Sequence, residues 1–449
     1  MKRREFLKAG GAAAAAAALV SACGKSTKSA PASSEDGTME YRTNPVNGDR
    51  TSLIGFGCMR WPMVKDSEGK DVIDQEAVNE MVDYAIEHGI NYFDTSPAYL
   101  QGQSERAAGK ALSRHPRSSY YLATKLSNFG DVSPEASIQM YKDSFKELNT
   151  DYFDYYLLHS IGRGGLPVFR RRYVENGMID FLLKEKEEGR IRNLGFSFHG
   201  EKETFDLFMD LHDSGEIRWD FVMIEMNYVD WKHADGVRNV NADYLYGELE
   251  RRGIPIMVME PLLGGSLAKV PAGVLRMMKE RDPDASAASW AFRFVGSHPG
   301  IQCILSGMTS MDPLRENVRT FTGFKSLTEE EMDFMEMMGT QIADFPLIKC
   351  TNCKYCMPCP WGVDIPGIFQ HYNKCITEGT YAQSTGQKNY HKLKRAYLIS
   401  YDRAVETLRQ ANHCIGCHVC VQHCPQFISI PRELRRIDNY IENLRKDTL

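Results

Sequence analysis

The sequence predicts an α/β protein: a (β/α)8 TIM barrel followed by a small, mainly helical, cysteine-rich domain. First, eight short apolar runs alternate with longer segments of helical periodicity between about residues 51 and 320, a pattern typical of parallel strands joined by helices. Second, 449 residues suit a barrel of about 250 residues or more with a smaller module. Third, eight of the twelve cysteines form two regular groups after residue 345.

The first 22 residues have the build of a cleavable export signal of the twin-arginine type. A basic start that contains Arg3 and Arg4 is followed by an alanine-rich apolar stretch. An amphipathic surface helix is the alternative interpretation, but residues 12–18 have no polar face. We therefore expect an exported protein.

The end of this signal predicts how the exported protein is attached to a membrane. Val20-Ser21-Ala22-Cys23 resembles a bacterial lipoprotein signal, in which the cysteine is lipidated after cleavage. A cut at an ordinary small-residue site, with an incidental cysteine, is the other interpretation. The next segment is rich in Ser, Ala and Lys and predicts a flexible tether over residues 23–42. The expected location is the periplasm or cell envelope, with a lipid anchor at Cys23.

Charge and hydropathy exclude two classes of partner. The formal net charge is −5, and it becomes −8 once the first 22 residues, with four basic and one acidic side chain, are removed. No basic patch suggests nucleic acid. No apolar run after the signal is long enough to span a bilayer, so membrane contact is expected through the lipid anchor alone.

The expected barrel occupies residues 43–340. Its strand candidates, in chain order, are 53–56, 91–94, 120–124, 152–158, 193–197, 221–225, 255–259 and 303–305. Helical periodicity marks segments such as 75–88, 135–148, 179–188, 201–214 and 285–295. A doubly wound open sheet is the alternative, but no strand is followed by the glycine fingerprint with which such sheets bind a dinucleotide.

The second domain is expected over residues 341–449. A helical stretch at 327–338 leads to the change in composition, and residues 391–411 and 431–446 also have helical periodicity.

Four polar residues fall at the ends of successive strand candidates, where a (β/α)8 barrel has its active site. Asp94, Lys125 and His159 end the second, third and fourth strands, and Tyr99 follows in the loop after Asp94. Carbonyl reduction needs an acid that gives a proton to the substrate oxygen. We expect Tyr99 to be that acid, with its pKa lowered by Lys125, while Asp94 holds the lysine and His159 orients the oxygen. Each residue alone is more often structural than catalytic, as a turn residue, surface charge, loop aromatic or core histidine.

Segments 89–99 (GINYFDTSPAY), 123–126 (ATKL) and 151–159 (DYFDYYLLH) resemble the aldo/keto reductase family. The resemblance covers roughly residues 50–320 and extends to 55–62, 195–197 and 316–317. It implies a catalytic tetrad of Asp94, Tyr99, Lys125 and His159, and a nicotinamide dinucleotide, NAD(H) or NADP(H), across the barrel mouth. It also implies cofactor contacts by Ser197, Glu316 and Asn317.

The nicotinamide contacts depart from the family pattern. Family members hold the amide with a Ser-Asn pair and a Gln, and stack a Tyr on the ring. Here Phe198 follows Ser197, and Met223 and Met259 stand at the expected Gln and Tyr positions.

Backbone N–H groups of two loops are candidates to bind the dinucleotide phosphates. The first loop is Gly264-Gly265-Ser266-Leu267, and the second contains Gly307; a plain tight turn is the alternative for each. Gly307 and Pro313 stand where NADP-preferring relatives have Lys and Arg, which favours NAD(H), although Arg315 and Arg319 could reach a phosphate.

The two cysteine groups predict a ferredoxin-like iron-sulfur domain with two [4Fe-4S] clusters. The first is C-x2-C-x2-C-x2-C-P and the second C-x2-C-x2-C-x3-C-P, which is the bacterial ferredoxin spacing. In such proteins the last cysteine of each run binds the other cluster. The expected ligand sets are therefore Cys350, Cys353, Cys356 with Cys424, and Cys414, Cys417, Cys420 with Cys359.

Zinc and disulfides are the alternatives for these cysteines. Zinc ribbons use two pairs of ligands without a Cys-Pro ending, and cysteines at three-residue steps suit a metal cube better than cross-links. Cys58, Cys303 and Cys375 lie outside the motifs and are expected to be core or incidental thiols without a ligand role. Segments 359–366 (CPWGVDIP) and 424–426 (CPQ) resemble an aldo/keto reductase subgroup with such a tail.

Three functions follow as hypotheses. The first is an exported oxidoreductase that interconverts a small carbonyl and an alcohol, with Tyr99 as acid and base and clusters that exchange electrons with the site or an unknown partner. The second is an iron-sulfur electron-transfer protein whose barrel no longer uses a nicotinamide. The third is a tethered binding protein for a sugar-like ligand, and the complete tetrad makes it the weakest.

Overall fold

The computed structural model describes residues 37–234 and 239–449, and its centre is a closed barrel of eight parallel strands. All eight predicted strands are present, with ends within three residues of those expected. In chain order they are β3 (Ile54–Gly57), β6 (Tyr92–Asp94), β7 (Tyr121–Leu126), β8 (Phe153–Ile161), β9 (Ile191–Phe198), β10 (Phe221–Glu225), β11 (Ile256–Met259) and β12 (Ile301–Ser306). The (β/α)8 prediction is therefore confirmed.

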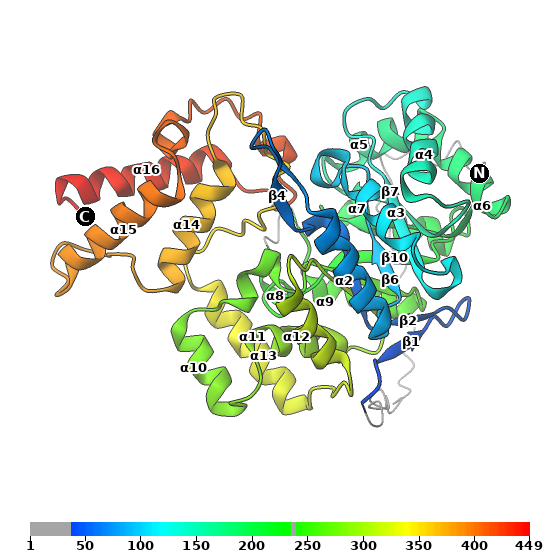
Figure 1. Ribbon diagram of the computed structural model, residues 1–449, viewed down its shortest axis with the longest axis horizontal. Coiled ribbons are helices and arrows are strands. Elements are labelled where there is room, and N and C mark those ends of the chain that lie inside the picture. Colours follow the sequence, from blue (N-terminus) through cyan, green and yellow to red (C-terminus); the bar gives the residue numbers. More distant parts are fainter. Residues whose placement is uncertain (1–36, 235–238) are drawn as a thin grey trace, which may run out of the picture.

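Helices surround this barrel and bury a large apolar core against it (Figure 1). Their first residues follow capping rules. Ser133 caps α4 (Pro134–Leu148) by accepting from the Ala136 N–H, with Pro134 at the first helical position. Ser286 caps α11 (Ala287–Gly296) in the same way, which is why this helix begins two residues later than its periodicity predicts. The other α-helices along the barrel are α2 (Gln75–Glu87), α3 (Ser104–Leu112), α5 (Gly165–Phe169), α6 (Met178–Glu187), α7 (Lys202–Asp213), α8 (Asp230–His233), α9 (Ala242–Arg252), α10 (Ala272–Arg281), α12 (Met311–Phe321) and α13 (Glu329–Ala343).

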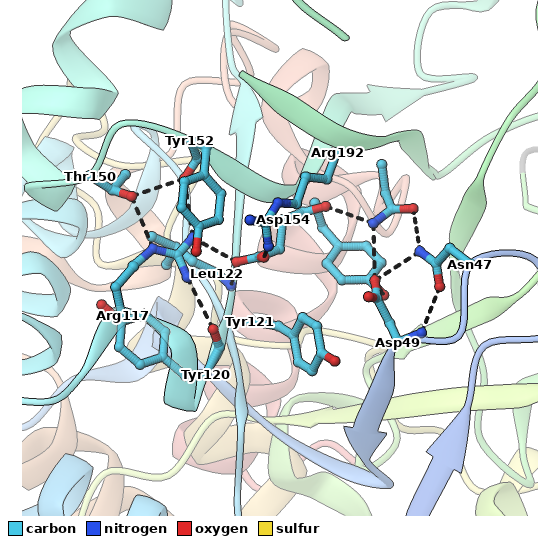
Figure 2. Close-up of polar contacts among 12 residues, drawn as sticks. Asn47, Asp49, Arg117, Tyr120, Tyr121, Leu122, Thr150, Tyr152, Asp154 and Arg192 are labelled. Atoms are coloured by element: carbon cyan, nitrogen blue, oxygen red, sulfur yellow. Dashed lines mark hydrogen bonds and ion pairs between the residues drawn. The ribbon is translucent and has the colours of Figure 1, made fainter. Parts of the chain in front are cut away.

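The N-terminal end of the barrel is closed by a polar network (Figure 2). The hairpin of β1 (Tyr41–Thr43) and β2 (Arg50–Ser52) brings Asp49 to the Tyr155 hydroxyl, which donates to it at 2.8 Å. The buried carboxylate of Asp154 accepts from Arg117 at 2.6 Å and from Arg192 at 2.9 Å. The cavities beside the predicted catalytic residues lie at the opposite end of the barrel.

This hairpin corrects the predicted tether. Met39 is 7% exposed and belongs to the main core, and Tyr41 already lies in β1, so residues 39–42 are packed rather than flexible. The apolar side chain of Met39 and the hydrogen bond from Tyr41 to the Gly89 carbonyl, 2.9 Å long, account for the difference. The signal, Cys23 and the rest of the tether lie outside the described residues.

The C-terminal residues form a second core beside the barrel. It is built by α14 (Ile365–Thr377), α15 (Tyr390–Ala404) and α16 (Ile430–Lys446), which lie together on one side of the molecule (Figure 1). The helix predicted over 391–411 is too long, because Val405 is extended and the Gln410 amide donates to its carbonyl at 3.3 Å. None of the helices in the described ranges is both long and apolar enough to cross a membrane.

Candidate active site

The four predicted catalytic residues meet at the open end of the barrel. Lys125 on β7 donates from Nζ to Asp94 Oδ1 at 2.6 Å and to the Thr95 carbonyl at 2.8 Å. Its Nζ lies 4.9 Å from the centre of the Tyr99 ring, which is in turn 5.9 Å from the centre of the His159 ring. All four side chains are buried. Residues that are far apart in the chain therefore form one compact polar group.

His159 is held as a neutral imidazole. Its Nδ1 lies 2.6 Å from Ser127 Oγ and 3.3 Å from Ser96 Oγ, so two hydroxyls fix the orientation of the ring. Burial lowers the pKa of His159 well below its ordinary value, and the nearby Lys125 lowers it further. A neutral, oriented imidazole can hydrogen-bond to a substrate oxygen without carrying charge into the site.

The pKa of Tyr99 is raised, not lowered as the position of Lys125 predicts. Burial raises this pKa well above its ordinary value, and Asp94 and Tyr355 raise it further. Lys125 pairs with Asp94 and faces the ring of Tyr99, and burial outweighs the effect of its charge on the hydroxyl. The reason is desolvation, which sequence spacing does not reveal.

A small cavity adjoins the tetrad and has walls from both parts of the chain. Its volume is 50 Å³; Tyr99, Lys125 and His159 line it from the barrel, and Cys353, Tyr355 and Gln426 line it from the C-terminal residues. A second cavity of 140 Å³ continues along the barrel mouth past Asp94 and Tyr99 to Gly307. The C-terminal segment therefore caps the barrel mouth.

Hydrogen bonds and an ion pair fix this cap. Arg60 donates to the Thr351 carbonyl, and the Gln426 amide donates to both oxygens of Glu225 at 3.0 Å. Lys349 pairs with Asp230 at 2.8 Å.

Two buried carboxylic acids, which sequence analysis missed, lie at the same end of the barrel. Glu225 ends β10, and Glu260 follows β11 and lines both mouth cavities. Burial raises the pKa of Glu260 to about 7, and the nearby Glu225 contributes. The pKa of Glu225 is raised to about 8, first by burial and then by Asp230. His199 completes the group, with Nδ1 3.5 Å from Glu225 Oε2. The strand-end rule that selected the tetrad selects both glutamates as well.

In the first predicted phosphate loop, a backbone N–H group already has a hydrogen-bond partner within the protein. The Gly264 N–H donates to Glu260 Oε2 at 2.6 Å. Gly264 has φ +66°, and a Cβ there would lie 2.4 Å from Thr351 Cα, so the segment 350–353 covers this loop closely. Gly264 and Gly265 line both the mouth cavity and a larger cavity between the barrel and the C-terminal helices, and Ser266 and Leu267 line only the larger one.

The other predicted cofactor residues divide into two groups. Ser197 lines the tetrad cavity and accepts from the Ser160 N–H at 2.8 Å, and Gly307 lines the mouth cavity. Asn317 lies behind the site, where its amide donates to Ser306 Oγ at 3.0 Å, and Glu316 lines neither mouth cavity. Met223 is 1% exposed in the apolar filling of the barrel and does not face the mouth cavities.

The mouth cavity alone is too small for a dinucleotide. Sites for small organic ligands have volumes of about 300–1,000 Å³, whereas this cavity has 140 Å³ and Thr351 covers Gly264 at its edge. A larger cavity of 800 Å³ shares Gly264 and Gly265 with it.

The predicted ligands of the first cluster come together. Cys350, Cys353, Cys356 and Cys424 line one cavity, whose other walls are mainly apolar side chains. The crossed set, three cysteines from one run and the fourth from the other, is the one that the ferredoxin spacing predicts.

The second predicted set is also close together. The pKa of Cys420 is raised to about 11, by burial and by the neighbouring Cys414, Cys359 and Cys417. All eight motif cysteines are free thiols, and Cys58, Cys303 and Cys375 are buried as expected. Among the described residues, no group of three or more ligand side chains is arranged to hold a metal ion. The cysteines of a [4Fe-4S] cluster bind different irons and stand further apart than the ligands of one ion, so the clusters stay a prediction.

Comparison with known proteins agrees with the barrel geometry. Residues 53–338 match the sequence model of the aldo/keto reductase family, and residues 1–20 match that of the twin-arginine translocation signal. The L-galactose dehydrogenase of Arabidopsis thaliana is 27% identical over 317 residues, which are 67% of this chain and 93% of that protein. The NADH-specific methylglyoxal reductase of Escherichia coli is 23% identical and is matched over 61% of this chain and 91% of its own length.

Solved structures show the same fold. An aldo-keto reductase of Bacillus halodurans in its holo form superposes with a TM-score of 0.53 at 22% identity, over 67% of this chain and 96% of that one. An aldo-keto reductase of Klebsiella pneumoniae in complex with NADPH gives a TM-score of 0.51 at 20% identity, over 67% of this chain and 95% of that one. Each of the two alignments covers about as many residues as the barrel contains.

Proposed function

The chain belongs to the aldo/keto reductase family, and from that premise we propose that it interconverts a small carbonyl and an alcohol with electrons that pass through two [4Fe-4S] clusters in residues 341–449. It is an oxidoreductase with a twin-arginine export signal. The proposal adds to this activity an electron transfer between the tetrad and the clusters that the cysteines would bind. Small substrates suit a cavity of 50 Å³.

One observation carries this proposal: Cys353 borders both the tetrad cavity and the cysteine cavity. Gln426 borders both cavities too and is fixed by Glu225. A group bound by Cys350, Cys353, Cys356 and Cys424 would therefore lie next to the substrate. This proximity supports electron exchange between the two sites.

The tetrad residues divide the proton chemistry. Tyr99 gives its phenolic proton to the substrate oxygen as negative charge develops there, and takes a proton back in the reverse direction. His159 orients that oxygen as a neutral hydrogen-bond partner. Asp94 and Lys125 fix each other below the ring of Tyr99 and hold it in place.

Glu260 is the proton reserve for Tyr99. Its carboxyl group lines the same cavity, and a pKa of about 7 lets it gain and lose a proton near neutrality. Tyr99, with its raised pKa, keeps its proton until the substrate oxygen becomes strongly basic. Glu260 can then restore the phenol.

We assign the supply of electrons to the two clusters that the cysteine residues would hold. Cys350, Cys353, Cys356 and Cys424 would hold the cluster nearer the tetrad, and Cys414, Cys417, Cys420 and Cys359 the other. If each cluster carries one electron, the pair would supply the two electrons that a carbonyl takes. The two protons would come from Tyr99, to the oxygen, and from Glu260 in the same cavity, to the carbon, and both residues would be reprotonated from solvent. Relatives such as the Klebsiella enzyme bind NADPH, which supports a nicotinamide, but no step here depends on one.

The small mouth cavity favours a second candidate function. While the segment 350–353 covers Gly264, the mouth leaves little room for a dinucleotide, which agrees with an iron-sulfur electron-transfer protein that carries out no carbonyl chemistry. Phe198 and Met259, at the positions expected to bind the nicotinamide, agree with that alternative.

Anaerobic purification of the folded precursor tests the proposal. We expect about eight iron atoms and eight sulfides for each chain. We also expect a carbonyl-reducing activity driven by dithionite that falls at least about 100-fold in Tyr99→Phe. Fewer than four irons for each chain would refute the proposed clusters. Undiminished turnover by Tyr99→Phe would refute the proposed role of Tyr99. Any dinucleotide released from the protein, identified by mass, would exclude the second candidate.

A further inference from the structure

The loops around the second cysteine set carry a group of exposed apolar side chains. Twelve large apolar side chains are exposed in the described residues, and four of them stand in or beside these loops. Leu408 is 79% exposed, Ile415 59%, Trp361 54% and Val419 43%, and we call these four the apolar group. Single exposed apolar side chains are ordinary, whereas four in one small region mark a contact surface.

Hydrogen bonds and the cysteine spacing bring the apolar group into one region. The turns that carry Leu408 and Trp361 are joined, because Arg409 donates from Nε to the Gly362 carbonyl at 3.2 Å. The members of the group other than Leu408 each lie within two residues of a cysteine of the second set, and those cysteines are close together. The four side chains therefore belong to a single surface.

Arginine side chains accompany the apolar group. Residues 403–436 contain five arginines and two glutamates, a formal net charge of +3, whereas the whole chain carries −5. Arg435 on α16 lies beside one of the cysteine loops, since a Cβ on Gly416 would be 4.0 Å from its guanidinium. Arg432, with a side chain 79% exposed, stands one turn earlier on the same face of the helix and pairs with Glu433. The surface thus combines apolar side chains with positive charge.

We propose that this surface binds an anionic membrane, with the apolar group among the lipid headgroups and the arginines beside the lipid phosphates. Tryptophan is enriched at membrane interfaces, and basic side chains are attracted to anionic lipids. The apolar group comes from separate turns and loops rather than from one helix or sheet face, and a lipid layer adapts to such an uneven surface. The inference does not depend on the proposed function.

This contact would set the orientation of the protein at the membrane. A lipid at Cys23 would bring the chain to a membrane without fixing which side of the protein faces it. The arginine-flanked surface would turn the second cysteine set toward the lipid. Binding through this surface alone is reversible and weakened by salt, so it is lost when membranes are washed.

Cosedimentation with vesicles tests the inference. The mature chain from residue 24, made without the signal and therefore without the lipid, is mixed with vesicles of phosphatidylcholine alone or of an equal mixture of phosphatidylcholine and phosphatidylglycerol. We expect half of the protein to bind at a lipid concentration at least about tenfold lower with the mixed vesicles. Raising the salt to about 0.5 M should remove most of this difference.

A double variant of the apolar group tests the apolar contact. Trp361→Ser with Leu408→Ser should raise the lipid concentration for half-binding at least about tenfold, because two apolar side chains no longer enter the interface. Leu275→Ser with Met337→Ser is the matched control, since these side chains are 39% and 44% exposed on α10 and α13 beside the barrel. The control should bind as the wild type does.

A second pair of variants separates local charge from net charge. Arg432→Gln with Arg435→Gln should weaken binding to the mixed vesicles about tenfold. Arg251→Gln with Arg276→Gln removes the same total charge from exposed positions on α9 and α10 and should leave binding unchanged.

Three results would overturn the inference: equal binding to neutral and mixed vesicles, an equal effect of either double variant and its control, or no binding to any vesicle. The last result would leave this surface to an acidic protein partner. None of these results bears on the proposed function, since vesicle binding needs neither substrate nor electrons.

Discussion

Lys125→Met removes the positive charge beside Asp94, and we expect it to destabilise the barrel strongly. The two side chains are 1% and 3% exposed, their charged atoms are 2.6 Å apart, and Asp94 Oδ2 has no other partner in the described chain. Removing one partner of a buried pair costs about 3–5 kcal/mol. For a barrel of this size that is on the order of a 10 °C fall in Tm.

Thermal unfolding of the anaerobic holoprotein, followed by near-ultraviolet circular dichroism, measures this loss. Lys146→Met is the control, because Lys146 pairs with Asp143 on the surface, where such pairs contribute little. Burial raises the pKa of Asp94, and without Lys125 that pKa rises further. The folded state of Lys125→Met then binds a proton more readily than the unfolded state, so its stability loss should shrink as the pH falls from 8 to about 5.

The double variant Asp94→Asn with Lys125→Met separates charge from packing. It has no buried charge, so it should recover most of the lost stability while remaining inactive. A Lys125→Met protein that unfolds within about 2 °C of the wild type would refute the reasoning, because that difference corresponds to less than about 1 kcal/mol. So would a double variant no more stable than Lys125→Met.

Three further predictions concern the proton reserve, the cluster and the anchor. Dithionite-driven carbonyl reduction should fall as the pH rises through about 7, where Glu260 loses its proton, and Glu260→Gln should lack this step of the pH profile; an unchanged profile would exclude Glu260. Cys424→Ala should lower the iron content from about eight to about four, while Cys375→Ala, outside both motifs, leaves it unchanged; equal iron in both variants would contradict the crossed ligand set. Cys23→Ala should move the exported protein from the membrane fraction to the soluble fraction, and an unchanged distribution would exclude the anchor.

The barrel could be predicted because its signals are local. Each strand reads as a short apolar run, since strands of a parallel sheet are buried on both faces, and each helix shows its own periodicity. The tetrad could be predicted for a related reason. Asp94, Lys125 and His159 stand at strand ends, and the closed barrel brings all strand ends to one mouth. The same rule applies to Glu225 and Glu260, which shows that strand-end carboxylates should be weighed even where no family motif contains them.

The cap over the barrel mouth could not be predicted, because it depends on pairs that no periodicity connects. Thr351 meets Gly264 and Gln426 meets Glu225 across separations of 87 and 201 residues. The raised pKa of Tyr99 has the same origin, since Tyr355 and the rest of the cap exclude water from the phenol. Spacing between charged residues predicts which groups meet, whereas desolvation depends on what covers them.

The same cap explains why a twin-arginine signal suits this chain. Cys353 and Tyr355 form part of the tetrad cavity, so this cavity is complete only when the cysteine segment is packed on the barrel. The residues that hold this packing, Arg60 and Gln426, come from opposite ends of the described chain. A chain exported unfolded would have to acquire iron and close the cap outside the cell. Transport of the folded protein, for which residues 1–20 carry a matching signal, would let the proposed clusters and the cap form together before export.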